Sequence, residues 1–237
     1  MRFDHAPSGL GGFRREPGGP ARRLVVLFHG HGANGADLAA LEERFADRVP
    51  DAVWLRPDAP FSVADGLTPE EVAAVRRARP DVSLEERRTW AAPGPASEPP
   101  PGAREMDART LFGHFVKPVE ESLDPAVSAV HRLIDAELDG LGLEDSALAL
   151  YGFSQGGLAA LHVGLTRPRP CACVVSHSGQ FFGLSEVRSA PPVLLLVGEH
   201  ELEDGKPGKH VFPYAVEALR EAGVEVEQYT RSEQHTS

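Results

Sequence analysis

The stretch of sequence that decides the fold is ALALYGFSQGG, residues 147–157. Its apolar beginning predicts a buried strand, and the Gly-x-Ser-x-Gly pattern after it is typical of a nucleophile elbow, a sharp turn between a strand and a helix. Gly152 and Gly156 lack the side chains that would collide in so tight a turn. The turn would hold the Ser154 hydroxyl above the sheet, at the start of a helix, where developing negative charge is stabilised.

The surroundings of this pattern support the interpretation, which the pentapeptide alone would not carry because Gly and Ser are common residues. Leu158, Leu161 and Leu165 recur at helical spacing after it. Elsewhere, short apolar runs alternate with helix-period stretches, which is typical of a mostly parallel sheet covered by helices on both faces. The expected strands are residues 24–28, 52–55, 147–151, 171–175, 193–197 and 224–229, and the expected helices lie within 38–49, 127–138 and 212–219.

One segment interrupts this alternation. Residues 62–110 are rich in Pro, Arg, Glu and Ala without a clear strand, so we expect a lid-like insertion there. Inside it, the TPEE signal at 68–71 predicts a short helix over 69–78. Because the 237 residues contain no evident linker or repeat, we expect a single α/β domain over 1–237.

The composition excludes several classes of protein. A formal net charge of −11 argues against a nucleic-acid partner and against electrostatic docking on an anionic membrane. The N-terminus lacks the apolar core of a signal peptide, and no apolar run approaches the ~18 residues that span a bilayer. We therefore expect a soluble, cytoplasmic protein without stable membrane insertion. Cys171 and Cys173 have no second cysteine pair to complete a metal site, and we expect them to be buried and reduced.

Acyl transfer by a serine needs a hydroxyl, a base, an acid that orients the base, and donors for the oxyanion. Ser154 supplies the hydroxyl. The glycines of HGHGANG, residues 29–35, would let backbone N–H groups point into the site after an expected strand. We expect the oxyanion hole to consist of the N–H groups of His31 and Gln155, and His29 to brace the loop.

The usual chain order in such enzymes is nucleophile, acid, histidine. His235 follows the last expected strand and is therefore the expected base. Several acidic residues follow the strand at 193–197, in EHELED at 199–204. We interpret this acidic run and the nearby His210 as a solvated loop rather than a metal site.

These motifs together resemble the phospholipase/carboxylesterase family of the α/β-hydrolase superfamily, which includes the acyl-protein thioesterases. The matching segments are LFHGHGANGADL at 27–38, RPDAPF at 56–61, GFSQGG at 152–157, SG at 178–179, PVLLLVG at 192–198, and His235. The resemblance covers nearly the whole chain outside 62–110 and implies the α/β-hydrolase fold. It also implies that Trp90 lines the acyl pocket and binds substrate.

The sequence departs from the family pattern at the acid. The family has an Asp three residues after the glycine that ends this strand, and the same offset from Gly198 falls on Glu201. Glu201 is therefore the expected acid, with Asp204 as the alternative. The family also continues past its histidine into a final helix, whereas two residues follow His235 here.

We therefore expect a serine hydrolase that cleaves small-molecule carboxylic esters or thioesters through an acyl-enzyme intermediate. Ser154, Glu201 and His235 are the expected catalytic residues, and no cofactor or metal is expected. The expected assembly is a monomer or a homodimer. The alternative is a hydrolase-fold binding or regulatory protein with impaired catalysis, which the unusual acid and the short segment after His235 would favour.

Overall fold

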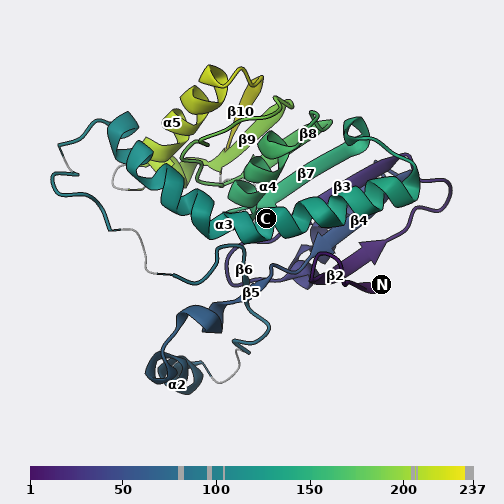
Figure 1. Ribbon diagram of the computed structural model, residues 1–237, viewed down its shortest axis with the longest axis horizontal. Helices are drawn as coiled ribbons and strands as arrows, with labels where there is room; N and C mark the ends of the chain where they lie inside the picture. Colours follow the sequence, from purple (N-terminus) through teal and green to yellow (C-terminus); the bar gives the residue numbers. More distant parts are fainter. Residues whose placement is uncertain (80–82, 95–97, 104, 204–205, 207, 233–237) are drawn as a thin grey trace.

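The computed structural model describes residues 1–79, 83–94, 98–103, 105–203, 206 and 208–232. Its centre is a sheet of eight strands in the order β1-β2-β4-β3-β7-β8-β9-β10 (Figure 1). β1 and β2 pair antiparallel, β2 is antiparallel to β4, and all remaining pairs are parallel. The strands are β1 (Arg2–His5), β2 (Leu10–Arg15), β3 (Arg23–Phe28), β4 (Ala52–Pro57), β7 (Leu148–Phe153), β8 (Cys173–His177), β9 (Val193–Gly198) and β10 (Val226–Arg231).

Helices cover both faces of this sheet, as the alternating sequence pattern predicted. The long helix α3 (Ala108–Leu141), α4 (Gln155–Thr166) and α5 (Gly208–Glu221) pack on one face, where their apolar side chains form the main core with the strands (Figure 1). The shorter α1 (Ala39–Ala46) packs on the other face over a smaller cluster that includes Trp54. In the described part of the chain, no helix combines the length and the apolar character that crossing a membrane requires.

The expected strands and helices are confirmed, and the differences have local causes. α3 extends far beyond the expected 127–138. It contains Pro118 and Pro125, and the sequence did not indicate its full length because proline ordinarily ends a helix. Asp107 caps its first turn and Gly142, with φ of 65°, ends it. The β1–β2 hairpin was not predicted, since its strands are short and rich in Arg and Gly.

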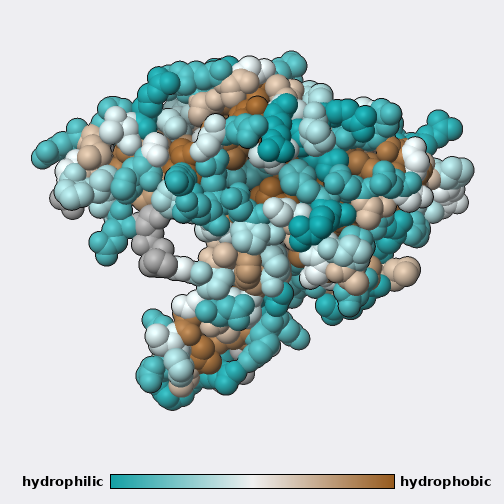
Figure 2. Space-filling model, in the orientation of Figure 1, coloured by the Kyte–Doolittle hydropathy of each residue, from teal (hydrophilic) through white to brown (hydrophobic). Residues whose placement is uncertain are grey.

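The insertion forms a small lobe that projects from the body (Figure 1). β5 (Phe61–Ser62) and β6 (Arg88–Thr89) form its antiparallel base, and α2 (Pro69–Ala78) is the helix that the TPEE signal predicted. The two strands were not expected, because two residues are too few to show a periodicity. Figure 2 shows this lobe standing away from the body, with apolar side chains gathered among hydrophilic ones.

The expected catalytic residues follow the carboxyl ends of the parallel strands. The chain runs from β3 outward to β4 on one side, and β7 returns to pair with β3 on the other. This reversal of strand order opens a crevice at the carboxyl edge, which is where open α/β sheets bind ligands. The loop at 29–35 follows β3, and Ser154 follows β7.

Candidate active site

Ser154 occupies a sharp turn between β7 and α4, with φ of 53° and ψ of −121°. Such a conformation is unfavourable for a non-glycine residue, so it persists only where surrounding contacts enforce it. A side chain at Gly152 would clash with the backbone of Gly156, and one at Gly156 would clash with the carbonyls of Phe28 and His29. Close backbone packing therefore holds the turn. The Ser154 side chain makes no cap hydrogen bond to its own helix.

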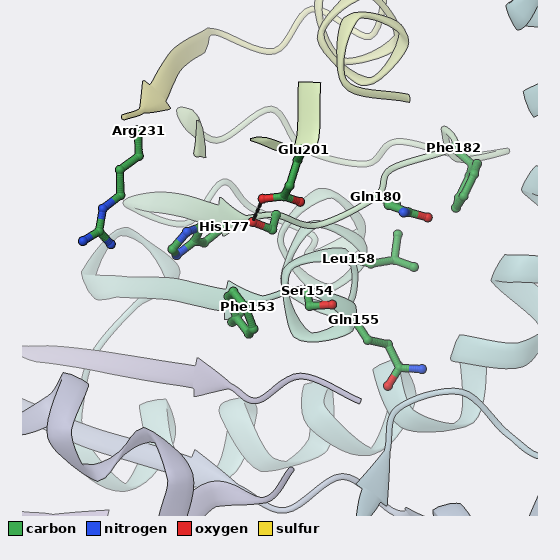
Figure 3. Close-up of a pocket in the computed structure, with 10 residues that line it drawn as sticks. Phe153, Ser154, Gln155, Leu158, His177, Gln180, Phe182, Glu201 and Arg231 are labelled. Atoms are coloured by element: carbon green, nitrogen blue, oxygen red, sulfur yellow. Dashed lines mark hydrogen bonds between the residues drawn. The ribbon is translucent and has the colours of Figure 1, made fainter. Parts of the chain in front are cut away.

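A cavity of about 810 Å³ opens over this hydroxyl. Figure 3 shows Leu158 and Phe182 to one side of Ser154, with His177 and Arg231 to the other and the Glu201 carboxylate above. The lining residues are Phe153, Ser154, Gln155, Leu158, His177, Ser178, Gln180, Phe182, Glu201 and Arg231. The cavity thus combines apolar and polar side chains around the half-buried Ser154.

Glu201 lies in the 3-10 helix η4 (Glu199–Leu202), directly after β9. Its Oε1 accepts hydrogen bonds from the Ser178 hydroxyl at 2.6 Å and from the Gly198 N–H at 3.2 Å. Figure 3 shows the second carboxylate oxygen turned away from this bond. The structure therefore brings Glu201 and Ser154 to the same cavity and fixes one oxygen of the acid. Asp204, the alternative acid, lies outside the described residues.

His235, the expected base, also lies outside the described residues. Among the described histidines, His177 lines the cavity, although it belongs to none of the predicted catalytic motifs. Its Nδ1 hydrogen-bonds with the Tyr151 hydroxyl at 3.1 Å. Burial lowers the pKa of His177, against the opposing effect of the nearby Glu201. Its place at the end of the strand next to β7 was the signal that could have identified it.

The sequence predicts the backbone N–H groups of His31 and Gln155 as the donors to a developing oxyanion. A side chain at Gly30 would begin 3.6 Å from the Cβ of Ser154, so the loop after β3 lies against the nucleophile. Within the described part of the chain, the His31 N–H donates no hydrogen bond. Gln155 is the first residue of α4, and its N–H has no partner inside the helix. An oxyanion hole formed by these two N–H groups stays a prediction.

Trp90 and His29 lie beneath the site and are fully buried. Trp90, expected to line the acyl pocket, is not among the residues that line this cavity, and its indole packs on Phe28 and His29 instead. His29 accepts a hydrogen bond at Nε2 from the Ala59 N–H at 3.0 Å, and burial lowers its pKa. His29 therefore braces the loop after β3 against the loop after β4, in line with its predicted role.

The acidic run at 199–210 and the two cysteines are the other groups with reactive or metal-binding side chains. In the 199–210 run, His200 pairs with Glu203 at 2.9 Å. The described residues include no group of three His, Cys, Asp or Glu side chains arranged to hold a metal ion. Cys171 is buried as expected, and burial raises the pKa of its thiol to about 12, whereas Cys173 is only half-buried.

Comparison with known proteins agrees with this geometry. The family model for phospholipase/carboxylesterase matches residues 107–197. Acyl-protein thioesterase 1 of Schizosaccharomyces pombe is 34% identical over 91 residues, which are 35% of this chain and 40% of that protein. The chain thus matches less than half of the length of this relative.

Solved structures extend the likeness to the whole fold. The crystal structure of esterase PE8 superposes with a TM-score of 0.69 at 26% identity, covering 94% of this chain and 89% of that one. SOBER1 of Arabidopsis thaliana superposes with a TM-score of 0.61 at 23% identity, covering 90% of each chain, and this likeness concerns the fold alone. The fold is that of the α/β hydrolases. The chain is thus similar to the phospholipase/carboxylesterase family over residues 107–197 and to an esterase over nearly its whole fold.

Proposed function

We propose that this protein is a serine hydrolase that cleaves carboxylic esters or thioesters through an acyl-enzyme intermediate. Ser154 Oγ attacks the acyl carbonyl, and its proton passes to His235, which then protonates the departing alcohol or thiol. Glu201 orients the imidazole and stabilises its charged form. Water, activated by the same imidazole, attacks the acyl-enzyme and releases the acid.

The observation that carries this proposal is the strained turn at Ser154 beneath a cavity that Glu201 also lines. Strain of this kind is retained where the surrounding structure requires one geometry, and here it directs a hydroxyl to a helix N-terminus. The N–H groups of His31 and Gln155 would stabilise the tetrahedral oxyanion by about 3 kcal/mol each. The likeness to an acyl-protein thioesterase and to an esterase supports the same reaction class.

The decisive test compares Ser154→Ala with the unaltered protein on a p-nitrophenyl ester and on an acyl thioester. We expect burst kinetics from the unaltered protein and loss of turnover by at least about 10³-fold in the variant. The exposed Ser83, which lies in the insertion, offers a matched control as Ser83→Ala. Turnover by Ser154→Ala at the unaltered rate would contradict the assignment of the nucleophile.

A fluorophosphonate probe distinguishes an active hydrolase from an inactive protein of the same fold, because it phosphonylates only an activated serine. We expect labelling of Ser154, located by peptide mass spectrometry, and protection by excess ester. An inert Ser154 in a folded protein would favour the binding or regulatory alternative.

A further inference from the structure

A short segment at the base of the insertion, Arg87–Trp90, contacts both parts of the proposed oxyanion hole, which are the loop after β3 and the first turn of α4. On the first loop, the Gly32 N–H donates to the Arg88 carbonyl at 2.9 Å, and the Arg88 N–H donates to the Ala33 carbonyl at 3.0 Å. The Arg87 guanidinium donates to the Gly32 carbonyl at 2.9 Å. Three hydrogen bonds therefore fix the backbone directly after His31.

The same segment holds the start of α4 through the side chain of Gln155. The Trp90 N–H donates to Gln155 Oε1 at 3.0 Å. The Thr89 hydroxyl lies 3.1 Å from Oε1 and 3.0 Å from Nε2 of the same amide. Thr89 is buried, so these bonds are shielded from water. The amide side chain of Gln155 is thus attached to the segment that contains β6, and Gln155 also lines the cavity over Ser154.

Trp90 contacts the start of the loop after β3. Its indole N–H donates to the His29 carbonyl at 2.8 Å, one residue before Gly30 turns toward Ser154. The ring has no exposed surface and packs against Phe28 at the end of β3. One segment of the chain therefore joins the loop after β3 to the first residue of α4.

We propose that Arg87, Thr89 and Trp90 are positioning residues that set the spacing between the two oxyanion donors. This inference rests on the proposed function and adds a role for the insertion in the same site. The donors belong to segments that follow different strands, namely the loop after β3 and the first turn of α4, so their separation is not fixed by either segment alone. Because donors must already point to where charge develops, a small displacement of one of them lowers the rate without weakening substrate binding.

The side chain of Thr89 offers the sharpest test. Thr89→Val removes the hydroxyl while keeping the shape, and Thr89→Ser keeps the hydroxyl. For Thr89→Val we expect kcat on a p-nitrophenyl ester to fall about tenfold to a hundredfold with KM within twofold of the unaltered value. An alkylboronic acid, which forms a tetrahedral adduct with the serine, should lose affinity by a similar factor. Thr89→Ser should restore both values to within about twofold.

Arg87→Gln provides a second variant that does not alter a buried position, with Arg76→Gln on α2 as its matched control. Arg76 pairs with Glu85 within the lobe and is exposed. We expect Arg87→Gln to lower kcat and boronate affinity together, and Arg76→Gln to change neither. Unfolding temperatures measured alongside identify any loss of folded protein.

The outcomes separate this inference from the proposed function. An active unaltered protein in which Thr89→Val and Arg87→Gln retain kcat and boronate affinity within twofold would overturn the positioning role alone. The positioning role is equally overturned if these variants raise KM while kcat stays constant. An unaltered protein without Ser154-dependent turnover would overturn the proposed function and this inference with it.

Discussion

The Ser178 hydroxyl donates a 2.6 Å hydrogen bond to Oε1 of Glu201, joining the end of β8 to the acid that follows β9. Ser178 itself is held at φ of 54°, and its N–H donates to the Leu196 carbonyl at 2.8 Å. With the Gly198 N–H as a second donor, one oxygen of the longer glutamate side chain is fully occupied. Two contacts thus orient the carboxylate of Glu201, the expected acid.

Replacement of Glu201 by Gln should lower kcat by about 10³- to 10⁴-fold with little effect on folding. The amide keeps the size of the side chain but cannot stabilise a charged imidazole, as in other serine hydrolase triads. Steady-state kinetics on a p-nitrophenyl ester measure the loss. Asp204→Asn is the matched control and should stay within threefold of the unaltered rate. A larger loss in Asp204→Asn than in Glu201→Gln would transfer the acid role to Asp204.

Removal of the Ser178 hydroxyl should lower kcat about tenfold to a hundredfold, because a hydrogen bond to a charged group contributes about 1.5–3 kcal/mol. Ser178→Ala and Ser178→Gly should lose the same factor, although glycine adopts the positive φ more easily. Equal losses assign the effect to the hydroxyl. A normal rate in Ser178→Gly and a slow one in Ser178→Ala would assign it to the backbone instead.

The turn at the nucleophile should tolerate no added methyl group. In Gly156→Ala the new Cβ would clash with the carbonyls of Phe28 and His29, which are backbone atoms that cannot rotate away. We expect a loss of several kcal/mol in the free energy of unfolding, or failure to fold. Gly140→Ala, in the exposed part of α3 with open space around it, should instead gain about 0.5–1 kcal/mol. Urea denaturation of both variants checks the contrast.

A buried ion cluster should dominate the electrostatic part of stability. Arg167 donates to Asp145 at 2.5 Å, and both side chains are 3% exposed. Asp145→Ala should cost about 3–5 kcal/mol, because it leaves a buried guanidinium short of a partner. Glu221→Ala breaks the Arg109 pair, whose side chains are more than half exposed, and should cost less than about 1 kcal/mol. Similar losses in the two variants would contradict this account.

His162 should make the protein sensitive to acid. Burial lowers its pKa from 6.5 to about 4, and its Nε2 has no hydrogen-bond partner among the described residues. Between these pH values the unfolded chain binds a proton that the folded protein excludes, so stability falls as the pH drops from 6.5 toward 4. The effect on unfolding free energy is on the order of 3 kcal/mol and is absent above about pH 7.

The variant His162→Leu should therefore lose less stability than the unaltered protein between about pH 7 and about pH 4.5, measured by urea denaturation. The leucine also replaces an unpaired polar group by an apolar one of similar size, which is close to neutral at about pH 7. His131, whose pKa burial also lowers to about 4, stays in both proteins and leaves a residual slope. If the free energy of unfolding depends on pH identically in the two proteins, His162 is not the source of the acid sensitivity.

Local sequence patterns identified most of the architecture. Alternating apolar runs identified β3, β4 and β7 through β10, and the capping signal at Thr68 gave the bounds of α2. Such features are readable because they depend on residues close together in the chain. The hairpin β1–β2 and the two-residue strands β5 and β6 were not predicted. Their sequences show no strand pattern, and they are strands only because they pair with another segment.

The sequence by itself determined the α/β framework, the turn that carries Ser154 and the two loops expected to supply oxyanion donors. Tertiary structure alone decided that Ser178 holds Glu201, that His177 lines the cavity and that β6 joins the loop after β3 to the start of α4. The physical reason is separation along the chain. A strand, a cap or a glycine turn is encoded by neighbours, whereas a hydrogen bond between Thr89 and Gln155 depends on how two distant segments pack against the same edge of the sheet.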